Sequence, residues 1–137
     1  MKYIMFFIVL VLSISFCGNF VLSDEIEVKK EIITLLKTRD DAVAKKDAEL
    51  FSSTKLDNIK NGATKGYMKL SSLESELLGI DYLDENSKEK VVAFVKETYF
   101  FDGKKSHIGH FMFLLAKVDA KWIIFRQMST KERVVRY

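Results

Sequence analysis

The sequence contains no proline and only one cysteine, Cys17, which lies near the amino terminus. A single cysteine cannot form an intramolecular disulfide, so the folded part must be stabilised by its hydrophobic core. Besides this cysteine there are only two histidines, His107 and His110, and we therefore expect neither a metal site nor a cofactor. The sequence also lacks a catalytic-triad pattern and a glycine-rich phosphate loop.

An excess of charge of one sign is also missing. The 22 basic and 19 acidic residues give a net charge of +3, and lysine pairs such as Lys29-Lys30 and Lys45-Lys46 alternate with acidic residues. Proteins that bind nucleic acids usually concentrate positive charge on one face. Only residues 131–137 are locally basic. We therefore predict a surface of mixed charge and no nucleic-acid partner.

The chain begins with an apolar leader. Lys2 precedes the uncharged apolar run of residues 3–16, and residues 21–23 (Val-Leu-Ser) have the small or β-branched side chains that a signal peptidase accepts. This pattern predicts a secretory signal peptide over residues 1–23 and a single mature domain over residues 24–137. The protein is then expected to be exported, either secreted or periplasmic.

Two other fates of the leader remain open. Residues 14–17 (Ile-Ser-Phe-Cys) resemble a lipoprotein signal in which Cys17 would be lipidated, although Phe16 replaces the usual small residue. Residues 3–22 are also just long enough to cross a hydrocarbon core of ~30 Å if cleavage fails, although Gly18 and Asn19 disfavour a membrane span. Membrane association is therefore expected only through a leader that is lipidated or left uncleaved.

The first half of the mature chain has a helical pattern. Apolar residues recur between residues 25 and 46 at close to a 3.6-residue period, which predicts an amphipathic helix. Asp47 is a candidate N-cap for a short second helix with Leu50 and Phe51 as apolar anchors. The polar, glycine-containing residues 57–66 then predict a loop.

The second half favours strands. Residues 67–83 have a mixed pattern, within which residues 77–83 are compatible with a strand or a short helix. Residues 90–101, 106–118 and 122–129 are rich in β-branched and aromatic side chains and predict three strands. The intervening polar residues predict turns at residues 84–87, 102–105 and 119–121.

This order of elements resembles the nuclear transport factor 2-like superfamily of cystatin-like cones. The resemblance rests on the helix over residues 28–46, the junction at residues 45–51 and the strands over residues 91–101, 106–118 and 122–129. It implies an α+β fold in which N-terminal helices pack on a curled antiparallel sheet and enclose a conical cavity. It also implies that two copies can pair through the sheet as a homodimer.

The enzymes of this superfamily, such as ketosteroid isomerases and polyketide cyclases, place a carboxylate or a His-Asp pair in the cavity. The catalytic candidates in this chain are Asp81, within an apolar run, and His110, which shares a strand face with Met112. Burial would tune either group as a general base. His110 would instead be structural if it lacks an orienting partner, and Asp81 would be inactive if it faces solvent. His107, beside the predicted hairpin turn, is expected to be solvated.

Other polar side chains could bind a ligand. Tyr82 and Tyr99 are hydrogen-bond candidates, although tyrosines in strands also serve packing. Met112 is a candidate apolar contact, and Arg126 could bind an acidic ligand or pair with Glu97. The charged residues Arg39, Asp40 and Asp41 are interpreted as an exposed helix surface.

Three functional hypotheses follow. The first is an exported domain that binds a hydrophobic small molecule or a protein partner without catalysis. The second is an isomerase, dehydratase or cyclase that uses Asp81 or His110 as base, with Tyr82, Tyr99 or Arg126 as polar support. The third is a structural envelope or dimerisation module. Convergence of polar groups in one enclosed pocket would favour the enzyme, whereas a mainly apolar pocket would favour the binding protein.

Overall fold

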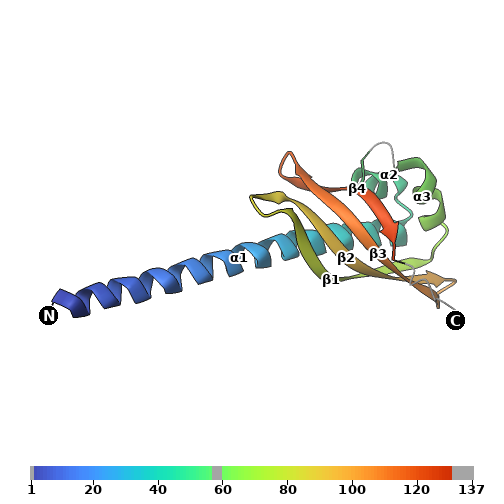
Figure 1. Cartoon of the computed structure of the whole chain (residues 1–137). Coiled ribbons are helices and arrows are strands. Elements are labelled where there is room, and N and C mark those ends of the chain that lie inside the picture. Colours follow the sequence, from blue (N-terminus) through green and yellow to red (C-terminus); the bar gives the residue numbers. More distant parts are fainter. Residues whose placement is uncertain (1, 57–59, 131–137) are drawn as a thin grey trace, which may run out of the picture. The chain divides into compact units, whose positions relative to one another are not determined.

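The computed structural model describes residues 2–56 and 60–130, without side-chain detail for residues 2–22 and 60–62. The elements are three helices followed by four strands: α1 (Lys2–Lys45), α2 (Ala48–Ser53), α3 (Lys60–Tyr67), β1 (Ser72–Asp84), β2 (Ser87–Phe101), β3 (Lys104–Val118) and β4 (Lys121–Ser129) (Figure 1). The chain divides into two units, residues 1–31 and residues 32–137.

The first unit is helical from Lys2 onward and carries an i,i+4 ion pair between Lys29 and Glu25. Signal cleavage, lipidation of Cys17 and anchoring remain predictions, because they concern a leader whose side chains up to residue 22 lie outside the described ones. Where side chains are described, no helix has both the length and the apolar character of a membrane span.

The second unit begins with the last turns of α1. Ile32, Leu36 and Val43 are buried at helical spacing, which confirms the predicted amphipathic helix. The helix ends where Lys46 adopts a left-handed conformation with φ of 58°, and the backbone nitrogen of Asp47 then donates to the carbonyl of Ala42. The Asp47 carboxylate accepts from the Leu50 nitrogen at 2.9 Å, which confirms the predicted N-cap of α2.

The prediction of a loop over residues 57–66 is wrong for residues 60–66, which belong to α3, while residues 57–59 lie outside the described part. The glycines and polar residues of this segment give it little helix propensity of its own. Its carboxyl end is anchored by tertiary contacts, because Tyr67 and Leu70 are buried in the core with Phe51. Tertiary packing therefore overrides local propensity here.

The four strands form one antiparallel sheet in the order β1-β2-β3-β4. The three predicted strands and their turns are confirmed, and residues 77–83, which the sequence left open, belong to β1. The turns at Asp102-Gly103 and Asp119-Ala120 each place two residues at positive φ, between 48° and 72°. This conformation is typical of tight hairpin turns that match the twist of the strands.

The register is irregular at two places between β1 and β2 (Leu77/Gly79 and Tyr82/Asp84), at one between β2 and β3 (Tyr99/Phe100) and at one between β3 and β4 (Leu114/Leu115). Such irregularities bend the strands. The inner face of the sheet is buried along β2 and the middle of β3; its buried residues are Leu73, Val91, Ala93, Val95, Glu97, Tyr99, Phe113, Leu115, Trp122 and Ile124. Along β3 the outer face carries mainly apolar side chains that are half-buried or exposed, and Ile108 among them is 41% exposed. The predicted α+β class, with N-terminal helices on an antiparallel sheet, is thus observed.

Candidate functional site

Glu97 on the inner face of β2 is the centre of a buried polar network. Its carboxylate accepts three hydrogen bonds, each from a different side chain. Arg39 of α1 donates from Nη2 to Oε1 at 3.0 Å. The hydroxyl of Tyr67, at the end of α3, donates to Oε2 at 2.5 Å, and that of Tyr99 donates to the same oxygen at 2.6 Å. Side chains from two elements that are distant in sequence, α1 and α3, therefore converge with Tyr99 of the same strand on one carboxylate.

Gln127 of β4 extends the network, because its Nε2 donates to the Tyr67 hydroxyl at 2.9 Å. The two tyrosine hydroxyl oxygens lie 3.4 Å apart. We call Arg39, Tyr67, Glu97, Tyr99 and Gln127 the Glu97 network. Since Glu97 and Arg39 are both 0% exposed, the network is shielded from bulk water at its charged end.

Aromatic rings surround the positive charges of this region. The Arg39 guanidinium carbon lies 4.8 Å from the ring centre of Phe51 and 4.9 Å from that of Phe113. The Lys55 ammonium lies 4.5 Å from the ring centre of Phe51 and 5.1 Å from that of Tyr67. The ring faces attract both cations and partly replace their lost hydration.

Burial changes the protonation behaviour of the groups in and beside the network. Burial, followed by the negative charge of Glu97, raises the pKa of Tyr67 to about 12 and raises the pKa of Tyr99 further. Burial, followed by the charge of Arg39, lowers the pKa of Lys55 to about 8. Both tyrosines therefore keep their protons at neutral pH and act as hydrogen-bond donors to Glu97.

A pocket of about 290 Å³ lies against the Glu97 network, between α3 and the ends of β2 and β3. Tyr67, Tyr99 and Gln127 belong to both its wall and the network. The rest of the wall is mainly apolar or aromatic and consists of Ala63, Gly66, Leu70, Phe101, His107 and Phe111. We call this cavity the tyrosine pocket.

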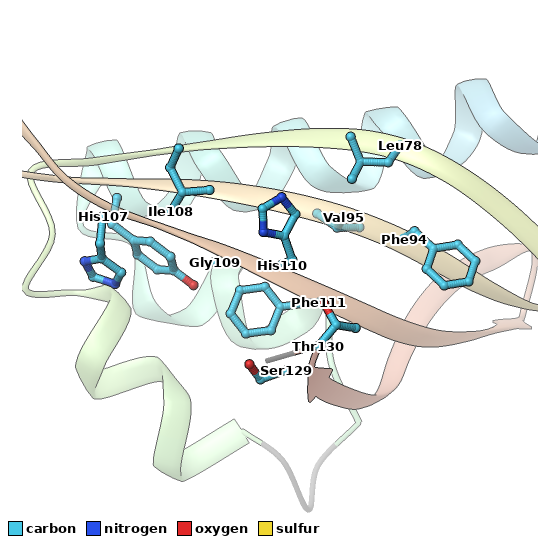
Figure 2. Close-up of a pocket in the computed structure, with 11 residues that line it drawn as sticks. Leu78, Phe94, Val95, His107, Ile108, Gly109, His110, Phe111, Ser129 and Thr130 are labelled. Atoms are coloured by element: carbon cyan, nitrogen blue, oxygen red, sulfur yellow. The ribbon is translucent and has the colours of Figure 1, made fainter. Parts of the chain in front are cut away.

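A larger groove of about 900 Å³ lies along β3 (Figure 2). Ile108, His110, Leu78 and Phe94 line it on the outer face, while Tyr99 and Phe111 line it on the inner face. Gly109 permits the close approach of Phe111, since a Cβ atom at residue 109 would lie 2.5 Å from the Phe111 ring. We call this hollow the β3 groove.

The structure separates the two predicted catalytic residues from the network. Asp81 pairs with Val92 and is exposed on the outer face, which is the solvent-facing placement that the sequence left open. His110 is also exposed on the outer face, opposite Lys96 in β2, and lines the β3 groove. Neither side chain is a member of the Glu97 network or a lining residue of the tyrosine pocket.

Of the predicted ligand-binding residues, Tyr99 alone belongs to the Glu97 network. Tyr82 is half-buried opposite Val91, near the other end of β2. Met112 is half-buried on the outer face opposite Met128, and Arg126 is exposed on the same face opposite Leu114. His107 is exposed as expected, and its ring stacks on Tyr99 with 4.3 Å between ring centres.

Two interpretations of charged residues are wrong. The suggested pairing of Arg126 with Glu97 does not occur, because Glu97 is paired with Arg39 on the other face of the sheet. Arg39 and Asp40 are not exposed helix charges, since Arg39 is completely buried and the Asp40 carboxylate accepts from Ser75 Oγ at 2.6 Å and from its backbone nitrogen at 2.8 Å. Only Asp41 is exposed as interpreted.

A sequence signal for the Glu97 network was present. Arg39 lies three residues after Leu36 and four residues before Val43, so it falls on the same face of the helix as these two apolar residues. Glu97 is two residues from both Val95 and Tyr99, so in a strand it lies on the same face as they do. A charged residue on each of two buried faces indicates a buried ion pair. Among the described residues, no group of three His, Cys, Asp or Glu side chains is arranged to hold a metal ion.

No protein-family model matches the sequence, and no curated protein is similar to it. Crystal structures do match its fold. An NTF-2 like protein of unknown function from Shewanella oneidensis has 17% identity and a TM-score of 0.61, over 74% of this chain and 97% of that one. A proposed calcium/calmodulin dependent protein kinase II association domain from Xanthomonas campestris has 18% identity and a TM-score of 0.57, over 77% and 88%.

A proposed scytalone dehydratase from Novosphingobium aromaticivorans has 14% identity and a TM-score of 0.52, over 82% of this chain and 93% of that one. The chain thus has the nuclear transport factor 2-like fold, as the resemblance drawn from its sequence implied. Because similar folds host unrelated activities, the match establishes architecture and leaves function to be argued from the site.

Proposed function

We propose that this chain binds a small, mainly apolar molecule with one hydrogen-bond donor in the tyrosine pocket, without chemical conversion. One observation carries the proposal: Tyr67, Tyr99 and Gln127 are shared between the wall of the pocket and the Glu97 network. The network therefore fixes the orientation of the polar groups that a ligand would meet, which is how a binding site gains specificity.

The direction of the hydrogen bonds defines the class of ligand. Both tyrosine hydroxyls donate their single proton to Glu97, so toward a ligand their oxygens can only accept. The remaining wall consists largely of apolar groups, which favour an apolar body. A hydroxyl or N–H group on a hydrocarbon or aromatic skeleton satisfies both requirements.

The same hydrogen bonds argue against catalysis by Glu97. A general base must be able to take a proton from a substrate, whereas both oxygens of Glu97 are engaged by donors and the carboxylate is completely buried. Asp81 and His110 lie on the outer face and have no orienting partner within the network. The site thus supports binding better than it supports an isomerase or dehydratase.

The setting of this function is part of the proposal. We propose that the leader directs export with cleavage after Ser23; the support is the charged, apolar and small-residue pattern of residues 2–23. Pairing of two copies through the sheet is likewise a proposal, and the half-buried apolar side chains of the outer face, such as Leu114 and Met112, support it.

The binding proposal is tested with 2-naphthol, an aromatic alcohol, and with 2-methoxynaphthalene, which lacks the hydroxyl proton. We expect 2-naphthol to bind the full chain, with NMR shifts at Tyr99 and Gln127, and the ether to bind about tenfold more weakly, the equivalent of one lost hydrogen bond. Ala63→Phe, which fills the pocket from α3, is expected to abolish binding. The matched control Lys65→Phe adds the same ring to an exposed position of α3 that does not line the pocket.

Equal binding of alcohol and ether, unaffected by Ala63→Phe, would contradict the proposal. Enolisable ketones provide the competing measurement. Turnover of such a ketone that disappears in Asp81→Asn or His110→Gln, with the fold intact, would establish the enzyme in place of the binding protein.

A further inference from the structure

The sheet has an open edge where β3 extends beyond β4. The last residue of β4, Ser129, pairs with Phe111, whereas β3 begins seven residues earlier at Lys104. Residues 104–110 pair with β2 on one side, and no strand in the described part of the chain pairs with them on the other. The nitrogen of Thr130 donates to the carbonyl of His110 at 2.9 Å, which is the last hydrogen bond of the ladder among the residues that the structure describes.

The β3 groove lies at this edge. Its lining includes Ile108 and His110 from the outer face of the sheet and Tyr99 and Phe111 from the inner face. Figure 2 shows that Thr130, at the end of β4, lies at one side of the groove, with Ile108 and His110 further along β3. The β3 groove has a volume of about 900 Å³, which is large enough for an extended peptide segment and far larger than the space that one water molecule needs.

Backbone groups along the edge are oriented for pairing. In an antiparallel ladder, successive residues direct their N–H and C=O groups alternately to the two neighbouring strands. The carbonyl of His110 is directed to the β4 side, where it accepts from Thr130. Ile108, two residues earlier, therefore directs its N–H and C=O to the same side, where β4 has ended. An added strand would continue the ladder from this residue.

The charge of the edge selects its partner. Residues 104–110 contain Lys104, Lys105, His107 and His110 and no acidic residue, and both lysines are exposed. Lysines on an edge strand oppose pairing with an identical edge. The carboxyl-terminal residues 131–137 of this chain are also basic, with three cationic residues and one acid, so they would bring like charges together. An acidic segment is favoured instead.

We propose that the free edge of β3 over residues 104–110 is a docking site for an extended acidic segment of a partner protein, which adds to the sheet in line with β4. Backbone hydrogen bonds from Ile108 hold the segment, and Lys104 and Lys105 attract its carboxylates. Apolar side chains on one face of the segment lie against Ile108, which lines the groove on the outer face of β3. This mode of recognition uses main-chain bonds for affinity and side-chain contacts for specificity.

The test uses two labelled heptapeptides, acetyl-EVEVEVE-amide and acetyl-KVKVKVK-amide, titrated with the full chain by fluorescence anisotropy. We expect the acidic peptide to bind at least about tenfold more tightly than the basic one in about 50 mM salt. The difference should shrink in about 300 mM salt, because exposed charges are then screened. Alternate N-methylation of the acidic peptide on the side that faces β3 should abolish binding, whereas methylation of the other amides should leave it intact.

Protein variants separate the edge from overall charge. We expect Lys104→Glu/Lys105→Glu to weaken binding of the acidic peptide about tenfold or more and to strengthen binding of the basic peptide. Lys90→Glu/Lys121→Glu makes the same change in net charge at exposed positions near the other end of the sheet, and its affinity should stay within about twofold of wild type. Circular dichroism and thermal melting check that both variants fold.

Five results would overturn the proposal, and the first four concern the peptides. The two peptides could bind equally tightly, or Lys90→Glu/Lys121→Glu could weaken binding of the acidic peptide as much as Lys104→Glu/Lys105→Glu does. N-methylation on either side of the acidic peptide could leave its affinity unchanged, or the acidic peptide could bind only after deletion of residues 131–137. The fourth result would assign the edge to the carboxyl terminus of the chain itself. Dimerisation that blocks peptide binding and is lost in Ile108→Pro would assign it to a second copy and would likewise overturn the proposal.

Discussion

Glu97 and Lys96 are neighbours in β2, and each forms an ion pair, but their side chains lie on opposite faces of the sheet. The Arg39–Glu97 pair on the inner face has an N–O distance of 3.0 Å, and the Lys96–Glu76 pair on the outer face has one of 2.8 Å. The inner side chains are 0% exposed, whereas Lys96 is 35% and Glu76 60% exposed. Two contacts of nearly equal length thus stand in very different environments.

The comparison shows that the surroundings of an ion pair determine its energetic role. The outer ion pair contributes little to the free energy of unfolding, because solvent screens its charges and two long side chains must be ordered to form it. The inner pair has lost its hydration, so neither member can be removed without leaving a buried charge. The inner face therefore depends on keeping both members of this pair, the more so because Nε and Nη1 of Arg39 are buried without a hydrogen-bond partner, whereas the outer face tolerates change.

The first prediction tests this asymmetry directly. Glu97→Leu should lower the free energy of unfolding by ~3–5 kcal/mol, because it leaves the Arg39 guanidinium buried without its partner. Lys96→Met, at the next residue of the same strand, should cost at most ~1 kcal/mol. Chemical denaturation of both variants measures the difference.

The double variant Arg39→Met/Glu97→Leu is the control. It removes both charges, so much of the stability lost in Glu97→Leu should return. If Glu97→Leu costs no more than Lys96→Met, the inner pair is not the buried, obligatory contact described above.

The second prediction compares two leucines that are adjacent in β3. Leu115 is completely buried on the inner face, whereas Leu114 is half-buried on the outer face. Leu115→Ala should cost ~2–5 kcal/mol, since it removes buried methyl groups and leaves a cavity in a close-packed core. Leu114→Ala should cost about 1 kcal/mol, because less apolar surface is removed from water there. Equal costs in urea denaturation would show that the outer face is as well covered as the inner one, for instance by a second copy.

Alternation in the strands allowed the sheet to be predicted from the sequence, but it did not show which face is buried. His107, Phe111 and Phe113 fall on one face of β3, and Ile108, Met112 and Leu114 on the other, and both sets are largely apolar. The helices decide the matter, because they cover only the inner face. The hairpin turns were predictable since Asp102-Gly103 and Asp119-Ala120 are local signals, whereas α3 depends on the distant anchoring of Tyr67.

The candidate site was predicted only at Tyr99. The sequence indicates Asp81 and His110 because they are polar residues within apolar runs, yet each falls on the outer face. Arg39 gives no clear signal because charged residues on a helix are usually exposed, and the sequence suggests Glu97 only as a partner of Arg126. Tyr67 begins the segment 67–83, whose pattern is mixed, and so the sequence gives it no role. Pairing across 58 residues, as between Arg39 and Glu97, cannot be obtained from local pattern alone.

The third prediction concerns Gly109, against which the ring of Phe111 lies closely. At Gly109 an added Cβ would lie 2.5 Å from the Phe111 ring, whereas at Gly79 nothing lies within 4 Å. Gly109→Ala should therefore cost ~1–3 kcal/mol by overpacking, while Gly79→Ala should be close to neutral or stabilising. The double variant Gly109→Ala/Phe111→Leu should recover part of the loss, as a double-mutant cycle would show. A neutral Gly109→Ala would mean that Phe111 can move aside without cost.

The last and smallest predicted effect is a pH dependence at Asp40, which is half-buried and so lies between the two extremes. Burial raises the pKa of Asp40 from 3.8 to about 6, against the hydrogen bonds from Ser75 and the charge of Arg39, which lower it. Because the pKa is higher in the folded than in the unfolded state, the contribution to stability is complete below about pH 3.8 and is lost as the pH rises through about 6.

Asp40→Asn cannot ionise, so its stability relative to wild type should improve by on the order of 1 kcal/mol between about pH 4 and about pH 7, a value reduced by solvent screening. Ser75→Ala should steepen the wild-type dependence, since it removes a hydrogen bond that lowers the pKa of Asp40. Urea denaturation across this pH range decides the matter, and parallel profiles for wild type and Asp40→Asn would place Asp40 with the solvated groups of the outer surface.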